Sequence, residues 1–356
     1  MSNRNVARGT RSQFNRRRLV AGSAAGAAIA AVGGAGRLTA FAQDATPGAS
    51  PVAGACAEPF DAGLLSTVNM VTDDAGVTVA IVPKGVHPFF EDCRIGAEEE
   101  AGSLGVTFEW QAPQQFDAAL QVRMIEDLIT RGVNAIVISP NEPTSVVDVI
   151  NRGLEQGILM VTFDSDSPDS NRVMYIGTDN VTAGKVQGDT LREALGGSGR
   201  IAIITGGLGA LNLNERIEGL RETIGPDIEV VETVATDEDL AKGISVSEAL
   251  LRAHPDLDGI ACMSATGGPT LAQVIQAPEF AEQRPVIVAF DDLQEVLDAI
   301  EAGIIYATMV QRPVQMGKLS ISEPFRMLTE GYVPECALLD TGVTVVTLDN
   351  ITTYTK

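Results

Sequence analysis

The stretch VTFDSDSPDSNRVMYIGTDN, residues Val161–Asn180, decides how this chain folds. Two short apolar runs, at 161–163 and 173–176, flank a polar turn, and a helical pattern begins after Asn180. Ligands of open parallel α/β sheets bind outside the carboxyl ends of the strands. Asp164 and Asp166 follow the first run directly, so they are either ligand-binding carboxylates or ordinary turn residues.

Strand and helix signals alternate on both sides of this stretch. Before it, apolar runs at 77–82, 106–110, 135–138 and 158–163 predict strands, with helical patterns between them. The same alternation continues after it, to residue 346. Strands that alternate with helices of this length indicate βαβ units and parallel sheets. Ten or more strands fit two doubly wound lobes better than one, so we predict an α/β fold of two such lobes.

The composition permits two large cores and argues against nucleic-acid binding. Hydrophobic residues make up 45% of the 356 residues, and the net charge of −22 is opposite to what phosphate binding requires. We predict no cofactor and no metal site. The open alternative is a metal site in which carboxylates at the strand ends converge, namely Asp164, Asp166, Asp291 and Asp292.

The first 42 residues predict an export signal. They contain seven Arg and no Asp or Glu, followed by a Gly/Ala-rich apolar run at 21–36 and the small-x-small site Ala40-Phe41-Ala42. The pair Arg16-Arg17 favours a twin-arginine signal over an ordinary secretory one. No later stretch is long and apolar enough to span a membrane. Residues 43–74 are assigned to a flexible tether, in which lipidation at Cys56 stays open.

The four cysteines match no zinc-binding spacing, and the sequence leaves all three disulfide pairings open. Cys262 lies in an apolar run and is expected in the core. The others are Cys56, Cys93 and Cys336.

Polar and aromatic residues follow several of the other predicted strands. Carboxylates and amides accept hydroxyl protons, Lys and Arg donate to sugar-like oxygens, and aromatic faces cover C–H groups. The set therefore suits a polyhydroxylated ligand, although each member could instead cap a helix, form a turn, pair on the surface or pack in the core. Its members are Lys84, His87, Phe89, Phe90, Ser139, Arg216, Ser264, Asp291 and Gln311.

Six segments, taken in order and spacing, resemble type I periplasmic sugar-binding proteins of the ribose, autoinducer-2 and rhamnose kind. The resemblance runs from about Val77 to the C-terminus and implies two lobes joined by three crossings. One lobe would comprise 75–178 with 312–341, and the other 179–311 with 342–356. The segments are IVPKGVHPFF (81–90), IGTDNVTAGKVQGD (176–189), ERIEGLRE (215–222), LLRAHPDLDGI (250–260), VIVAFDD (286–292) and ATMVQRPVQMGK (307–318).

The resemblance also implies which residues contact the ligand. Lys84 and Asp166 match polar contacts of the autoinducer-2 type. The chain departs from the ribose type at Ser165, Ser264 and Ala265, and at Glu238, where an aromatic residue is common, so the sugar stays open. The positions that match sugar contacts of the ribose type are His87, Phe89, Phe90, Ser139, Asp164, Arg216, Ser264, Asp291 and Gln311.

These observations predict an exported, monomeric solute-binding protein that captures a small carbohydrate and delivers it to the membrane permease of an ABC importer. The chain has only two His, no Gly-x-Ser-x-Gly elbow, no Gly-x-Gly-x-x-Gly after a strand and no Walker A sequence, so we predict no enzyme. One alternative is a receptor for a non-sugar polyol or an autoinducer-2-like signalling molecule. A signalling receptor stays open, whereas the sensor of a transcription regulator would carry a DNA-binding segment in place of the leader.

Overall fold

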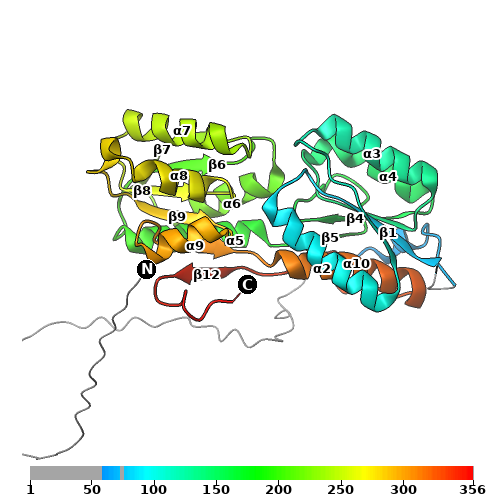
Figure 1. Cartoon of the computed structure of the whole chain (residues 1–356). Helices are drawn as coiled ribbons and strands as arrows, with labels where there is room; N and C mark the ends of the chain where they lie inside the picture. Colours follow the sequence, from blue (N-terminus) through cyan, green and yellow to red (C-terminus); the bar gives the residue numbers. More distant parts are fainter. Residues whose placement is uncertain (1–57, 73–75, 356) are drawn as a thin grey trace, which may run out of the picture. The chain divides into compact units, whose positions relative to one another are not determined.

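The computed structural model describes residues 58–72 and 76–355 (Figure 1). Within this part, the chain forms two six-stranded sheets with helices on both faces of each. Five of the twelve strands are buried along their whole length, and three more are buried except at their first one or two residues, which explains why these strands appear in the sequence as continuous apolar runs. The predicted fold of two doubly wound α/β lobes is confirmed.

The N-terminal lobe is built on a wholly parallel sheet with the order β11-β5-β4-β3-β1-β2. Its helices α2 and α10 cover one face, and α3 and α4 cover the other (Figure 1). The strands are β1 Thr78–Val82, β2 Thr107–Trp110, β3 Ala135–Ile138, β4 Leu159–Phe163, β5 Met174–Gly177 and β11 Leu338–Asp340; the helices are α2 Pro88–Leu104, α3 Ala118–Arg131, η2 Pro143–Val146, α4 Val147–Glu155 and α10 Pro313–Glu330.

The C-terminal lobe repeats this arrangement with the order β12-β10-β9-β8-β6-β7. Only β12 runs antiparallel to its neighbour, β10. Helices α5 and α6 pack together on one face, and α7, α8 and α9 on the other. The strands are β6 Gly199–Thr205, β7 Ile228–Ala235, β8 Gly259–Cys262, β9 Val286–Phe290, β10 Ala307–Val310 and β12 Thr344–Thr347; the helices are α5 Asn180–Ala194, α6 Leu211–Thr223, α7 Leu240–Ala253, α8 Gly267–Ile275, η3 Pro278–Phe280 and α9 Gln294–Glu301.

Three segments cross between the lobes, at 177–180, 310–313 and 340–344. They are bonded to one another: Thr341 N–H donates to Gly177 O, and Thr178 Oγ1 donates to Gln311 Oε1 at 3.0 Å. The crossings therefore lie side by side.

The tether predicted over residues 43–74 ends earlier than expected. Residues 58–72 lie against the N-terminal lobe and include the short helix α1 Ala62–Leu65. Val68 is buried in the core, Asn69 N–H donates to Gly157 O, and Val71 N–H donates to Leu328 O. The apolar residues of this segment are spaced too irregularly to reveal their packing from the sequence. The export signal and residues 43–57 lie outside the described residues.

Cys93 and Cys262 are buried free thiols, and Cys336 is disulfide-bonded. Cys262 packs in the core of the C-terminal lobe, as expected. Cys56 lies outside the described residues. Over residues 58–72 and 76–355, the helices are all too short or too polar to cross a bilayer.

Candidate functional site: a polar pocket at the strand ends of both lobes

A pocket of about 330 Å³ is lined by residues that follow strands of both sheets. This is where ligands bind in open parallel sheets. Eight of the residues singled out from the sequence lie in its wall: Lys84, His87, Phe89, Phe90, Asp164, Arg216, Ser264 and Asp291.

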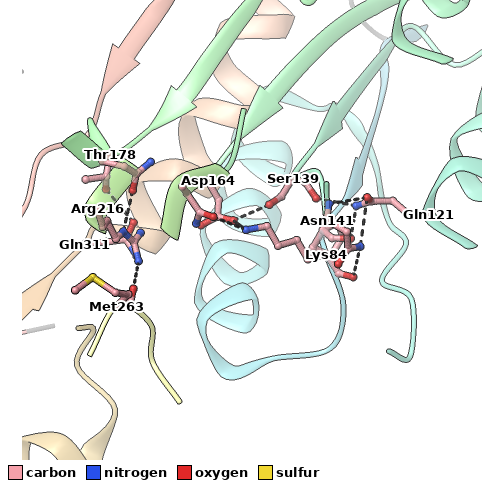
Figure 2. Close-up of polar contacts among 12 residues, drawn as sticks. Lys84, Gln121, Ser139, Asn141, Asp164, Thr178, Arg216, Met263 and Gln311 are labelled. Carbon is pink, nitrogen blue, oxygen red and sulfur yellow. Dashed lines mark hydrogen bonds and ion pairs between the residues drawn. The ribbon is translucent and has the colours of Figure 1, made fainter. Parts of the chain in front are cut away.

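Asp164 ends strand β4 in a left-handed backbone conformation, with φ of +60°. Its N–H donates to Ile176 O in β5, and the hydroxyl of Tyr175 donates to its carbonyl oxygen. Among the described residues, only one oxygen of its carboxylate, Oδ2, has polar partners. Ser139 Oγ donates to Oδ2 at 2.6 Å, and Lys84 Nζ lies 3.3 Å from the same atom. Figure 2 shows the side chains of Ser139 and Lys84 meeting at the carboxylate of Asp164.

Asp291 ends strand β9 in the same way, with φ of +65°. Its N–H donates to Met309 O in β10, and Thr308 Oγ1 donates to its carbonyl oxygen at 2.7 Å. Gln311 Nε2 donates to Oδ1 at 2.9 Å. Burial raises the pKa of Asp291 to about 7, although Arg216 and Gln311 oppose this shift.

The carboxylates of Asp164 and Asp291 are thus held in the same way. In each, one oxygen accepts a hydrogen bond from a buried neighbour, and the other, Asp164 Oδ1 or Asp291 Oδ2, accepts none from the residues that the structure describes. Both residues are buried, and both line the pocket. The pair is therefore arranged for hydroxyl or N–H donors supplied by a ligand.

Arg216 enters from helix α6 with its guanidinium 3.8 Å above the ring centre of Phe290. Nε donates to Asn180 Oδ1, and Nη1 donates to Met263 O at 2.8 Å (Figure 2). Nη2 is buried and has no hydrogen-bond partner among the described residues. Burial lowers the pKa of Arg216. The fork therefore has one donor group available for a ligand oxygen.

Lys84 connects the two lobes. Its Nζ lies near Asp164 in the N-terminal lobe and donates to Asn212 Oδ1 on α6 at 2.9 Å. The loop that carries Lys84 is held by Gln121, whose amide donates to Pro83 O and Ser139 O. Asn141 Nδ2 donates to Lys84 O (Figure 2). The buried Gln121 thus fixes two strand ends at once.

Aromatic rings form the apolar side of the pocket. Phe89 and Phe90 lie in the first turn of helix α2, and Phe90 packs edge-on against Phe163. His87 caps this helix, since its Nδ1 accepts from Phe89 N–H at 3.2 Å. The ring proton of the neutral form is therefore on Nε2. Burial lowers the pKa of His87 despite the nearby charges of Glu238 and Asp164.

Three predicted residues do not lie in the pocket wall. Ser139 and Gln311 are behind it and hold the two carboxylates. Asp166 turns away: Arg172 binds both of its oxygens, and Arg172 also binds Glu58 of the N-terminal segment. Asp164 and Asp166 lie in the loop after β4, where side chains do not alternate as they do along a strand, and Arg172 at the far end of this loop holds Asp166. In the described part of the chain, no group of acidic, His or Cys side chains is arranged to hold a metal ion.

The pocket wall also contains residues that the predicted set omitted. Asn141 follows a predicted strand and could have been included on that signal. Asn212 lies within helix α6, where a polar residue carries no local signal. Phe116 lies in a loop, and its ring faces His87 edge-on. The main additions are Phe116, Asn141, Glu142, Asn212 and Glu238.

Two doubly wound lobes with one polar pocket at the strand ends of both define the class, a two-lobed solute-binding protein. The chain belongs to the periplasmic binding protein domain family, which matches residues 79–329.

Comparison with known proteins supports this class. The chain is 28% identical over 236 residues to the ribose import binding protein RbsB of Haemophilus influenzae, covering 66% of this chain and 80% of that protein. It is 27% identical over 270 residues to the D-allose-binding periplasmic protein of Escherichia coli, covering 72% and 86%. A solved ABC transporter solute-binding protein from Burkholderia graminis, in complex with D-arabinose, is 48% identical with a TM-score of 0.77, covering 80% of this chain and 100% of that one.

The comparisons confirm the family resemblance and the expectation of a sugar-binding component of ABC importers rather than an enzyme. The alternative of a non-sugar polyol or signalling receptor is not favoured, because these relatives are named for sugars.

Proposed function

We propose that this exported protein closes its two lobes on one small cyclic sugar and delivers it to the permease of an ABC importer. One observation carries the proposal. Asp164 and Asp291, one from each lobe, line a common pocket, and each keeps one carboxylate oxygen without a hydrogen-bond partner among the described residues.

The chemistry of the wall suits a monosaccharide. The two free carboxylate oxygens accept hydroxyl protons, and Arg216 Nη2 donates to a ring or hydroxyl oxygen. Phe89 and Phe90 cover a C–H face. Lys84, His87 and Ser264 supply further polar contacts. In this proposal Ser139 and Gln311 position the carboxylates, and Asp166 holds the neighbouring loop through Arg172.

Binding closes the lobes because the ligand bonds to strand ends of both. A ligand that contacts both lobes binds the closed form more tightly and shifts the population toward it. The relatives named for ribose, allose and arabinose support a pentose or hexose of pyranose size. We further propose that the protein acts as a monomer, that it binds no nucleic acid and that a twin-arginine signal exports it.

Titration calorimetry with a panel of aldopentoses and aldohexoses tests the proposal. Wild-type protein is expected to bind at least one sugar. Asp164→Ala should weaken that binding by about 1–3 kcal/mol, because a sugar hydroxyl loses its acceptor. The matched control is Asp169→Ala, which removes an exposed carboxylate from the turn that follows. Wild-type protein that binds no sugar would contradict the function, and equal affinity in Asp164→Ala would remove Asp164 from the site.

A further inference from the structure

Glu238 is held in the pocket by an uncommon backbone. It lies in the turn between β7 and α7, where both Asp237 and Glu238 have left-handed φ, +54° and +55°. Residues other than glycine adopt this conformation rarely, and it persists where the surroundings hold it. Here Asp237 N–H donates to Gly206 O at 2.7 Å, and Glu238 N–H donates to Thr236 Oγ1. The turn is therefore fixed, and it presents the Glu238 side chain to the pocket.

The carboxylate of Glu238 is also fixed, by one oxygen. Oε2 accepts from Thr266 Oγ1 at 2.5 Å and from Ser264 Oγ at 3.2 Å. Gly206 makes room for the carboxylate, because a Cβ at that position would overlap Oε1. Three segments that follow β6, β7 and β8 thus hold one acidic group in place.

The other oxygen of Glu238 is available. Oε1 accepts no hydrogen bond from any side chain or backbone group in residues 58–72 and 76–355. The charge of Glu238 also acts on His87 in the opposite lobe. It raises the pKa of His87, although burial lowers the same pKa by a larger amount. Glu238 therefore repeats the design of Asp164 and Asp291, with one oxygen anchored and one free.

We propose that Glu238 is a specificity-determining residue whose Oε1 accepts a hydrogen bond from one hydroxyl of the bound sugar. This inference rests on the proposed function and deepens it. An aromatic side chain at this position would cover C–H groups instead. Glu238 requires a donor there, so the protein selects sugars with a hydroxyl at one particular carbon and rejects the corresponding deoxy sugar.

Glu238→Gln is a sharp test, because the change keeps the shape of the side chain. Ser264 and Thr266 donate to the anchored oxygen, so the amide oxygen takes that place. The amide nitrogen then replaces Oε1, and the acceptor that faces the ligand becomes a donor. A site that accepts a hydrogen bond from a ligand hydroxyl binds the ligand much more weakly when that hydrogen bond cannot form.

The experiment compares wild type, Glu238→Gln and the control Glu248→Gln, which changes a half-buried Glu on helix α7 that pairs with Arg252 outside the pocket. Calorimetry uses the tightest binder among D-ribose, D-xylose and D-arabinose, together with its monodeoxy derivatives. Glu238→Gln should bind the parent sugar roughly tenfold or more weakly at unchanged melting temperature. For one deoxy derivative, wild type and Glu238→Gln should agree within about twofold, because the hydroxyl that Glu238 binds is already absent.

Two outcomes would overturn the inference while leaving the proposed function intact. One is a Glu238→Gln variant that binds the parent sugar as wild type does. The other is an equal loss for the parent and every deoxy derivative, which would indicate a structural effect rather than a bond to one hydroxyl. If wild-type protein binds no sugar in the panel, the proposed function and this inference fail together.

Discussion

At the residue scale, each lobe presents an Asp side chain to the pocket through the same kind of backbone turn. Asp164 and Asp291 follow equivalent strands and adopt nearly the same φ. In each case the N–H donates to the next strand, and a hydroxyl from that strand donates to the Asp carbonyl oxygen. Asp tolerates this conformation better than most residues. The turn aims each carboxylate at the pocket and keeps it there without a ligand.

We expect Asp291→Asn to stabilise the ligand-free protein at about pH 8 and to weaken sugar binding. The pKa of Asp291, about 7 when folded, lies above the value of 3.8 for an unperturbed Asp. The Asp291 carboxyl group therefore binds its proton more tightly in the folded protein than in the unfolded chain. Its contribution to the free energy of unfolding falls as the pH rises from 3.8 to about 7. Asn is neutral at every pH and accepts a positive φ.

The expected gain is about 1–3 kcal/mol in the free energy of unfolding at about pH 8, and it should vanish toward pH 4. Urea denaturation at several pH values measures it. A variant less stable than wild type at about pH 8 would mean that Arg216 and Gln311 more than offset the burial of the charge.

At the scale of elements, glycines set the distance between paired helices. In α2 and α10, a Cβ at Gly96 would overlap Val314 O, and one at Gly317 would overlap Cys93 O. In α5 and α6, Gly184 and Gly219 meet Arg216 O and Val181 O in the same way. The α5–α6 contact also carries Arg216 and Asn180, so this packing positions the guanidinium in the pocket.

We predict that Gly317→Ala destabilises the protein by about 1–3 kcal/mol, because the added methyl group forces α2 and α10 apart. The control is Gly102→Ala, also in a helix, where nothing lies within 4 Å of the added Cβ. That change should stabilise by roughly 0.5–1 kcal/mol, since Ala loses less backbone entropy than Gly. Chemical denaturation measures both variants. Equal effects of the two changes would show that the helices can shift at little cost.

At the scale of the whole molecule, bonded contacts join the pocket to the crossings. Asp291 accepts from Gln311, and Gln311 accepts from Thr178 in another crossing. On the other side, Arg216 binds Asn180 at the start of α5. A ligand that engages Asp291 and Arg216 therefore acts directly on two of the three segments that connect the lobes.

Export of the whole chain carries its own prediction. Replacing Arg16 and Arg17 by Lys should leave precursor in the cytoplasm, because the twin-arginine route reads the Arg pair rather than its charge. Fractionation and immunoblotting of cells that express the full chain measure this. Replacing Arg8 and Arg11 by Lys, a change of equal charge, should leave export intact. Unimpaired export of the Arg16 and Arg17 variant would point to the general secretory route.

Local sequence determined much of this protein. Continuous apolar runs identified the buried parallel strands, and their alternation with helices identified two lobes. Residues singled out near the ends of those runs include eight of the 21 that line the pocket, among them Asp164 and Asp291. This succeeds because parallel strands all end at the same edge, so position along the chain indicates position in the fold.

Only the tertiary structure decided which polar groups stay available to a ligand. Asp164 and Asp166 are two residues apart, yet one faces the pocket and the other pairs with Arg172 and, through it, Glu58. Residues 58–72 pack on the N-terminal lobe, and Glu238 reaches the pocket because Gly206, Ser264 and Thr266 hold it there. These outcomes depend on partners distant in the sequence, since burial makes each polar group find a hydrogen bond wherever the fold supplies one.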